Sequence, residues 1–91
     1  LYDRLNQRKQ ALIAGNAEAI AKSYTAKLFQ KRETLLRKLN EEATEVTLAA
    51  ALNQGQRQLV WELGDLLYFA SVLAVDEGIS WSQLQAELAG R

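Results

Sequence analysis

Five acidic residues in two short groups are the part of the sequence best suited to chemistry. The first group is Glu41, Glu42 and Glu45, and the second is Glu62 and Asp65. The chain contains no histidine and no cysteine, which excludes mechanisms that need an imidazole base or a thiolate nucleophile. Catalysis must then rest on carboxylates, lysines, hydroxyls or a hard cation. Carboxylate ligands without nitrogen or sulfur favour Mg²⁺ or Mn²⁺.

Basic residues precede the first acidic group. Residues 22–38 contain six lysines and arginines and a single acid, Glu33. A basic segment beside an acidic one suits a polyanionic ligand that carries a divalent cation, although an ordinary solvated helix face explains the pattern equally well. Over the whole chain, 11 basic residues balance 11 acidic residues, which argues against a general nucleic-acid-binding protein.

The elements that must position these residues are helices. The chain has no proline, is rich in strong helix formers and shows no alternating pattern typical of a strand. We predict helices over about 2–14, 16–21, 31–52, 56–77 and 81–89, with an interruption at residues 23–25. Ser80 and Gln83 have the spacing of a capping box before the last helix. The sequence therefore predicts one all-α domain over 1–91, a bundle-like arrangement of four to five helices.

Helical spacing places the acids next to the apolar faces of the two long helices. Successive residues rotate by about 100°. The apolar stripe predicted for the first long helix is Leu35, Leu39, Ala43, Val46 and Ala50. The stripe predicted for the second is Leu59, Leu63, Leu66, Ala70 and Leu73. Glu42 and Glu62 fall at the edges of these stripes, Glu45 and Asp65 follow one turn later, and Glu41 points to solvent. An antiparallel hairpin would bring four carboxylates together.

The helix predicted over 56–77 is apolar on nearly every face. Between Arg57 and Asp76 its charged residues are Glu62 and Asp65. Such a helix is normally buried, and buried carboxylates need a counter-charge or a metal. Ion pairs of Glu42 with Lys38, or of Asp65 with Arg57 or a partner chain, are the structural alternative. Because a chain this short buries only roughly 60–65% of its unfolded surface, we also expect oligomerisation.

No targeting segment is visible in the sequence. The uncharged stretch over residues 66–75 is too short to span a bilayer. With no cysteine and no signal peptide, we expect a cytoplasmic location without membrane association.

Three segments together resemble a known family. The acidic segments resemble the EExxE…ExxD pattern of the MazG-like all-α nucleotide pyrophosphohydrolases. They are Glu41-Glu42-Ala43-Thr44-Glu45 and, after sixteen further residues, Glu62-Leu63-Gly64-Asp65. The segment Ser23–Leu28 resembles the SYTAxL segment of phosphoribosyl-ATP pyrophosphohydrolase of histidine biosynthesis. Asp65–Tyr68, Gly78–Ser80 and the final helix resemble the C-terminal part of that enzyme. The resemblance covers about residues 1–90 in the correct order.

The resemblance implies a homodimeric enzyme that uses Mg²⁺, with Mn²⁺ as an alternative, to hydrolyse phosphoribosyl-ATP to phosphoribosyl-AMP and pyrophosphate. The implied metal ligands are Glu42, Glu45, Glu62 and Asp65, and Glu41 is a further catalytic candidate that would orient a water. The candidate substrate contacts, which offer hydroxyls, a ring or cationic donors, are Ser23, Tyr24, Thr25, Lys27, Lys31, Arg32 and Lys38. In many organisms the domain is fused to a phosphoribosyl-AMP cyclohydrolase, which is therefore an expected partner.

Two other functions stay open. One is a house-cleaning nucleoside triphosphate pyrophosphohydrolase of the same superfamily, which residues 23–28 argue against. The other is a non-catalytic helical dimerisation module that has kept the fold.

Overall fold

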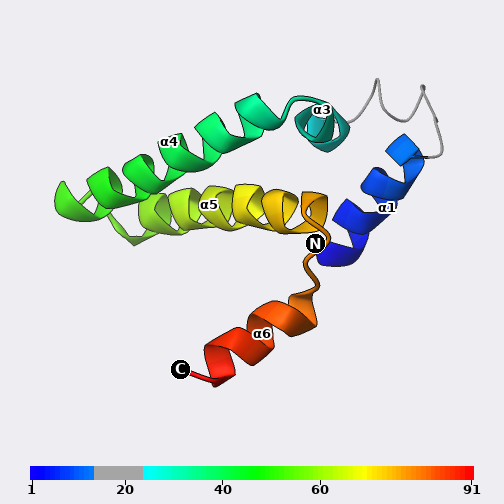
Figure 1. Cartoon of the computed structure of the whole chain (residues 1–91). Helices are drawn as coiled ribbons and strands as arrows, with labels where there is room; N and C mark the ends of the chain where they lie inside the picture. The colour runs from blue at the N-terminus through cyan, green and yellow to red at the C-terminus, as the bar shows by residue number, and fades with distance from the viewer. Residues whose placement is uncertain (14–23) are drawn as a thin grey trace.

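The computed structural model describes residues 1–13 and 24–91, and within these ranges the chain is helical with no strands (Figure 1). The helices are α1 (Tyr2–Ile13), α3 (Tyr24–Gln30), α4 (Arg32–Ala51), α5 (Gln56–Asp76) and α6 (Trp81–Ala89). The predicted all-α, bundle-like fold is confirmed. The bounds predicted for α1, α4 and α5 are correct to within one residue, and those of α6 match. The helix predicted over 16–21 lies outside the described residues.

The segment expected to interrupt the helices is itself helical where the structure describes it. Tyr24 and Thr25 form the start of α3, so the predicted interruption is wrong at these two positions, and Ser23 lies outside the described residues. Thr25 and its neighbour Ala26 are buried. Tertiary burial of this kind routinely overrides a weak helix propensity. The interruption lies later instead, at Lys31, whose backbone leaves helical geometry between α3 and α4.

Helices α4 and α5 form an antiparallel hairpin, the longest part of the molecule (Figure 1). The turn between them contains Asn53 with φ of 51° and Gly55 with φ of 102°. Asparagine and glycine tolerate this left-handed backbone better than other residues. The turn is therefore short, and it brings the acidic group of α4 level with that of α5.

The faces that α4 and α5 turn toward each other differ from the predicted stripes. On α4 the buried residues are Leu35, Glu42 and Ala49. On α5 they are Glu62, Phe69, Val72, Ala74 and Val75. By contrast, the predicted stripe residues Ala43, Ala50, Leu63 and Ala70 are exposed. The prediction was wrong at these four positions, whereas the other six stripe residues are buried or half-buried. Because α5 is apolar nearly all round, periodicity alone does not single out one of its faces. Glu42 and Glu62 consequently lie inside the interface and not at its edge.

The hydrophobic core lies where α1 and α3 pack against one end of the hairpin. Its buried members are Leu5, Leu28, Leu35, Phe69, Val72 and Val75. Polar contacts also hold α1 there. Lys9 Nζ donates to the carbonyls of Val75 (2.7 Å) and Asp76 (3.0 Å), and the Tyr2 hydroxyl donates to the carbonyl of Ile79 (2.9 Å). Carbonyls at a helix C-terminus lack intrahelical partners, so a lysine placed there satisfies them and favours the helix dipole.

Helix α6 extends away from the hairpin (Figure 1). The predicted capping box is confirmed, because the Gln83 amide donates to Ser80 Oγ (3.1 Å) and the Ser80 amide donates to Gln83 Oε1 (2.7 Å). None of the α6 residues is buried. The ring of Trp81 lies 5.9 Å from that of Tyr2, centroid to centroid. Local capping thus defines the start of α6, while its apolar side chains stay exposed.

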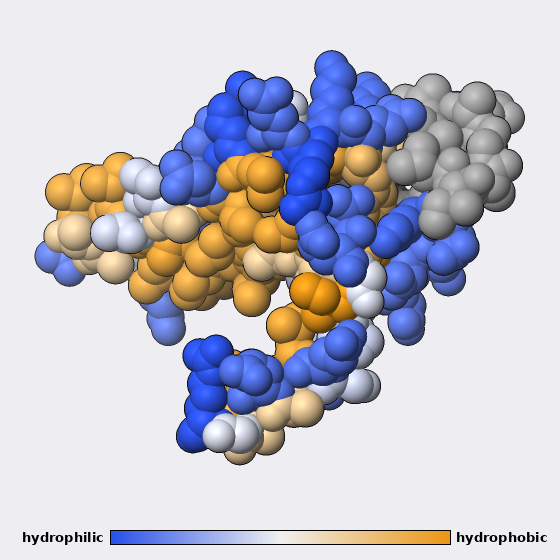
Figure 2. Space-filling model, in the orientation of Figure 1, coloured by the Kyte–Doolittle hydropathy of each residue, from blue (hydrophilic) through white to orange (hydrophobic). Residues whose placement is uncertain are grey.

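The outer face of α5 is apolar and exposed in the single chain. Val60, Leu63 and Leu67 are between 41% and 65% exposed, and Figure 2 shows apolar surface along the hairpin. The expectation that α5 is buried on every side is therefore wrong for one chain taken alone. By length and composition α5 would also pass as a membrane span, although Glu62 and Asp65 would be costly inside a bilayer. The radius of gyration, 14.8 Å, exceeds the about 12 Å expected of a compact domain of this length.

Two adjacent leucines of α4 test the described packing. Leu35 is fully buried, whereas Leu36 is 43% exposed. We expect Leu35→Ala to lower the free energy of unfolding by about 2–4 kcal/mol because it leaves a cavity in the core. Leu36→Ala should cost less than about 1 kcal/mol. Urea unfolding followed by circular dichroism measures both, and equal losses would contradict the described orientation of α4.

Candidate metal centre

Three carboxylates meet inside the α4–α5 hairpin. Glu42 comes from α4, and Glu62 and Asp65 lie one turn apart on α5. One oxygen from each residue can be chosen so that all three lie within 4.8 Å of one another. Ligand oxygens around one Mg²⁺ ion are separated by about 3–4 Å, since each lies about 2.1 Å from the ion. The observed spacing therefore suits a single hard cation after small side-chain adjustments.

Two of these carboxylates have buried oxygens that lack a hydrogen-bond partner. Glu42 and Glu62 are each 8% exposed, and the Oε2 atom of each is buried and unpartnered. The other oxygen of Glu62 accepts a hydrogen bond from Gln58 Nε2 at 2.8 Å. Nearly all buried polar atoms in proteins are hydrogen-bonded, so unpartnered ones require a specific explanation. A cation between the two carboxylates would supply one.

Glu45 adjoins this cluster from its solvent side. It follows Glu42 by one turn of α4 and is exposed. Its carboxyl group lies near those of Glu42 and Glu62 and raises the pKa of both. The four predicted metal ligands therefore occupy one region of the hairpin, three of them tightly grouped and the fourth at the rim.

The proximity of the acids changes their protonation. Burial raises the pKa of Glu42 to about 7, and the negative charges of Glu45 and Asp65 contribute to the rise. The pKa of Glu62 is also raised, first by the hydrogen bond with Glu45 and then by burial, while the Gln58 donor acts in the opposite direction. A divalent cation would favour the ionised forms and reverse these shifts.

Ion pairs do not account for the buried acids in the described part of the chain. Lys38 lies 3.4 Å from Glu41 and so does not pair with Glu42. Arg37 also approaches Glu41, at 3.7 Å. Among the side chains that the structure describes, no lysine or arginine forms a salt bridge with Glu42, Glu62 or Asp65. The pairs Glu42–Lys38 and Asp65–Arg57 are therefore contradicted, whereas a pair of Asp65 with a partner chain stays a prediction.

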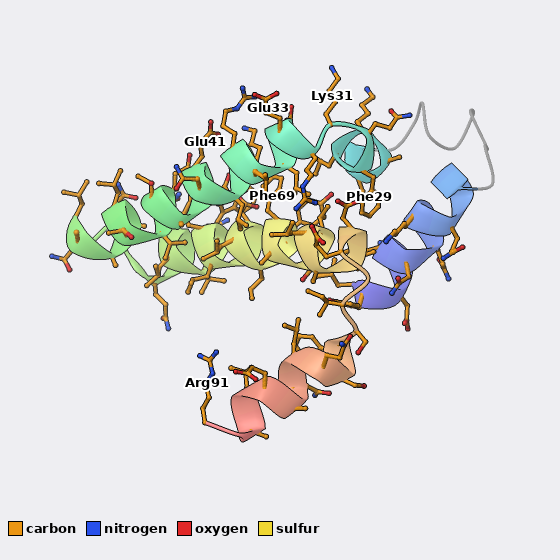
Figure 3. All side chains as sticks on the ribbon, in the orientation of Figure 1. Phe29, Lys31, Glu33, Glu41, Phe69 and Arg91 are labelled. Atoms are coloured by element: carbon orange, nitrogen blue, oxygen red, sulfur yellow. The ribbon has the colours of Figure 1, made fainter. Side chains whose placement is uncertain are left out.

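Glu41, the fifth predicted catalytic residue, points away from the cluster. Figure 3 shows it on the side of α4 that faces away from α5, where Arg37 and Lys38 surround it. This orientation agrees with the direction predicted from helical spacing. Its role in orienting a water stays a prediction.

The predicted substrate contacts lie in different surroundings. Lys27 and Lys31 are exposed, and Figure 3 shows Lys31 projecting outward between α3 and α4. Arg32 pairs with Asp76 (3.0 Å) and with Glu77, and it lies about 15 Å along α4 from Glu42 at 1.5 Å per residue. These roles, and that of Lys38, stay predictions.

The hydroxyl-bearing candidates precede Lys27. Thr25 is buried, and its hydroxyl is hydrogen-bonded to the Tyr68 hydroxyl. Ser23 and the side chain of Tyr24 lie outside what the structure describes. Substrate contact by these three residues stays a prediction.

Sequence reasoning missed Gln58 and Tyr68. Gln58 precedes Glu62 by four residues, a spacing at which helical side chains meet, so this contact was visible in the sequence. The contact between Tyr68 and Thr25 spans 43 positions, and no local pattern could have revealed it.

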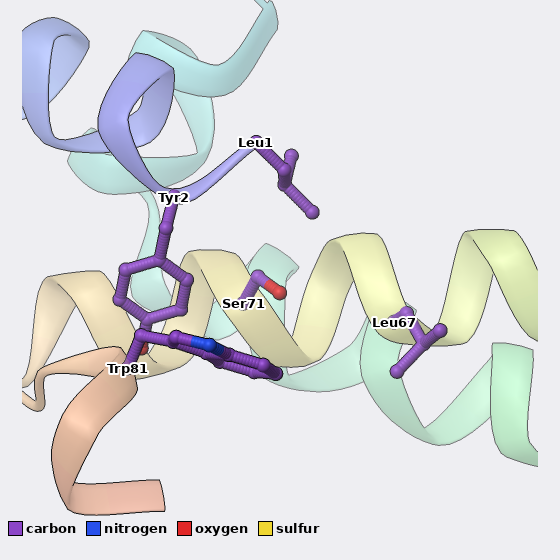
Figure 4. Close-up of a pocket in the computed structure, with 5 residues that line it drawn as sticks. All are labelled: Leu1, Tyr2, Leu67, Ser71 and Trp81. Atoms are coloured by element: carbon purple, nitrogen blue, oxygen red, sulfur yellow. The ribbon is translucent and has the colours of Figure 1, made fainter. Parts of the chain in front are cut away.

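A pocket of about 330 Å³ lies apart from the acids (Figure 4). It is lined by Leu1, Tyr2, Leu67, Ser71 and Trp81, from α1, α5 and the start of α6. At about 100° per residue, Leu67 and Ser71 are on the side of α5 opposite Asp65 and Glu62. The pocket is thus separate from the candidate metal centre.

Comparisons with known proteins agree with the arrangement of the acids. The family model for phosphoribosyl-ATP pyrophosphohydrolase matches residues 5–91. A phosphoribosyl-ATP pyrophosphatase of Lactiplantibacillus plantarum is 42% identical over 92 aligned positions, which cover 100% of this chain and 79% of that protein. One of Leptospira biflexa is 39% identical, covering 100% of this chain and 91% of that protein.

A longer relative carries the same domain. The histidine biosynthesis bifunctional protein HisIE of Caldanaerobacter subterraneus is 37% identical over 92 positions, which are 100% of this chain and 41% of that protein. Since the family model spans nearly the whole chain and these relatives match along its full length, the chain belongs to the phosphoribosyl-ATP pyrophosphohydrolase family.

Proposed function

We propose that this chain hydrolyses phosphoribosyl-ATP to phosphoribosyl-AMP and pyrophosphate in histidine biosynthesis, with Mg²⁺ bound by Glu42, Glu45, Glu62 and Asp65. The observation that carries the proposal is the grouping of three carboxylates within 4.8 Å, two of them with buried, unpartnered oxygens. The names of the relatives support the substrate and the pathway.

The ligand set fits Mg²⁺, with Mn²⁺ as the second choice. All donors are carboxylate oxygens in a chain without histidine or cysteine, which disfavours zinc and copper. When bound, a divalent cation neutralises phosphate charge and lowers the pKa of a coordinated water. Glu42 and Glu62 hold their oxygens in place through burial, and Gln58 orients Glu62 by its hydrogen bond.

The basic residues of α3 and α4 supply donors for the phosphates. Lys27 and Lys31 are exposed, so they can contact a polyanion without losing a partner that the structure records. Arg32 and Lys38 would have to leave their ion pairs with Asp76, Glu77 and Glu41. Exposed pairs of this kind contribute under about 1 kcal/mol, and a triphosphate offers more charge than a single carboxylate does. All four therefore stay in the proposed substrate site.

We also propose that the chain forms a homodimer through the outer face of α5. At about 100° per residue, Leu63 and Leu67 lie opposite Asp65 and Phe69, so the face that carries them points away from α4. Exposed apolar patches of this kind mark interaction sites. A second copy placed there would add burial that a single chain with a radius of gyration of 14.8 Å lacks.

Two predictions about the cellular setting are based on the family. A cytoplasmic location and an association with phosphoribosyl-AMP cyclohydrolase stay predictions. The bifunctional relative supports the association, because it shows that a domain of this kind occurs in one chain with a second activity of histidine biosynthesis.

Pyrophosphate release tests the proposed reaction. We expect Mg²⁺-dependent release from phosphoribosyl-ATP, and we expect Asp65→Asn to lower kcat at least about a hundredfold because it removes a metal ligand. Asp3→Asn, the same change at an exposed aspartate of α1, should have no effect. Faster release from deoxynucleoside triphosphates would favour a house-cleaning enzyme, and no Mg²⁺-dependent release from either substrate would favour a non-catalytic module.

The raised pKa of Glu42 predicts how stability depends on pH. Between its ordinary value of 4.5 and the folded value of about 7, the folded state binds more protons than the unfolded state, so stability without a divalent cation should fall as pH rises through this window. Mg²⁺ should raise the melting temperature more at about pH 8 than at about pH 5.

The variant Glu42→Gln isolates the contribution of this residue, because a neutral amide does not titrate. It should flatten the fall in stability and reduce the Mg²⁺ effect in thermal melts. A Mg²⁺ effect equal at both pH values, and unchanged in the variant, would show that the buried acids are not the binding site.

A charge on the outer face of α5 tests the dimer. Leu67 and Leu52 are 65% and 64% exposed, respectively, but Leu52 follows the end of α4 in the turn. We expect Leu67→Glu to give monomers at about 10 µM and Leu52→Glu to leave the dimer intact, because a buried unpaired charge opposes association. Sedimentation equilibrium measures this. A Leu67→Glu protein that still dimerises would place the interface elsewhere.

A further inference from the structure

A hydrogen bond between two hydroxyl groups joins α3 to α5. It links Thr25 and Tyr68, which are 43 positions apart in the sequence. Thr25 is 4% exposed, and Tyr68 is half-buried against the hydrophobic core. One hydroxyl donates to the other, and the bond is partly buried. Removing either one would leave its partner without this bond.

Tyr68 stands one turn after Asp65 on α5. Helical side chains tilt toward the N-terminus of their helix, so the Tyr68 side chain extends over the turn that carries Asp65. Asp65 in turn supplies one of the three oxygens of the acid cluster. The hydrogen bond of Tyr68 therefore acts at the level of the candidate metal centre.

On the other side of the bond, Thr25 lies in the first turn of α3, two residues before the exposed Lys27. Helix α3 has seven residues, too few to be stable without tertiary contacts. Leu28 and Ala26 bury one side of it and hold it to the body by apolar contact. Apolar contact is not directional, however, whereas a hydrogen bond restricts both distance and angle.

We propose that Thr25 and Tyr68 are positioning residues: their hydrogen bond fixes the orientation of α3 relative to the acid cluster, and with it the approach of Lys27 to the substrate phosphates. This inference rests on the proposed function, because the substrate whose phosphates it positions is the one proposed above. Valine and phenylalanine at the same two positions would fill nearly the same volume. What the hydroxyls add is therefore orientation and not burial.

The test compares matched removals of a single hydroxyl. Tyr68→Phe and Thr25→Val each break the bond, Thr25→Ser keeps a hydroxyl, and the double variant measures coupling. Tyr2→Phe is the control, because the Tyr2 hydroxyl donates to the carbonyl of Ile79 in the segment between α5 and α6. Each protein is assayed for kcat and KM with phosphoribosyl-ATP, for the Mg²⁺ midpoint of thermal stabilisation, and for hydrogen exchange of the α3 amides.

The expected pattern separates positioning from general destabilisation. Tyr68→Phe and Thr25→Val should lower kcat/KM about tenfold, as befits one hydrogen bond, and the double variant should lose no more than either single one. Exchange at α3 should accelerate while the Mg²⁺ midpoint stays unchanged. Thr25→Ser should retain most activity, and Tyr2→Phe should change neither kcat/KM nor exchange at α3.

Two different failures can be told apart. If the wild-type protein does not hydrolyse phosphoribosyl-ATP, the proposed function and this inference are both overturned. If the wild-type protein is active but Tyr68→Phe behaves like Tyr2→Phe, both in kinetics and in hydrogen exchange at α3, only the positioning role is overturned. Additive losses of kcat/KM in the double variant would overturn it as well. If Thr25→Val does not fold, Tyr68→Phe decides, because it keeps the ring and its packing.

Discussion

The repulsion among carboxylates buried between α4 and α5 is the constraint that the rest of the structure has to accommodate. Glu42, Glu62 and Asp65 lie close together, and Glu42 and Glu62 each have a buried oxygen without a hydrogen-bond partner among the described residues. Such an arrangement opposes helix packing unless a proton or a cation neutralises it. The pKa of Glu42 is raised to about 7, so a proton would compete with a cation for these carboxylates. Binding of a metal by these few oxygens would therefore be linked to folding.

The remaining helices hold the hairpin closed against this repulsion. The apolar core lies at the end where α1 and α3 pack. At that same end Arg32 pairs with Asp76 and Glu77, and Lys9 binds the carbonyls of the last turn of α5. The opposite end is closed by the tight turn at Asn53 and Gly55. The acids thus lie between two fixed ends, which keeps their carboxyl groups together without direct ion pairs among the described residues.

The sequence predicted those features that depend on local signals. Long runs of helix formers gave the bounds of α4 and α5 to within one residue, and the Ser80–Gln83 spacing gave the start of α6. Two acid pairs at helical spacing, joined by a short turn, predicted that the carboxylates converge. The rotation of α5 was not predictable, because apolar residues surround this helix and its hydrophobic periodicity does not tell which side packs against α4. The helicity at Thr25 depends on the burial of this residue, and the Thr25–Tyr68 bond joins residues that no local pattern connects.

The central claim is that a divalent cation occupies the space between the α4 and α5 carboxylates, and anomalous diffraction tests it most directly. Crystals of the chain grown with Mn²⁺ should show a manganese peak within bonding distance of Glu42, Glu62 and Asp65, with the two unpartnered oxygens as ligands. The same crystals of Glu62→Gln should lack the peak. The account would be contradicted if wild-type crystals showed no peak there and instead a lysine or arginine of a second copy lay between the acids.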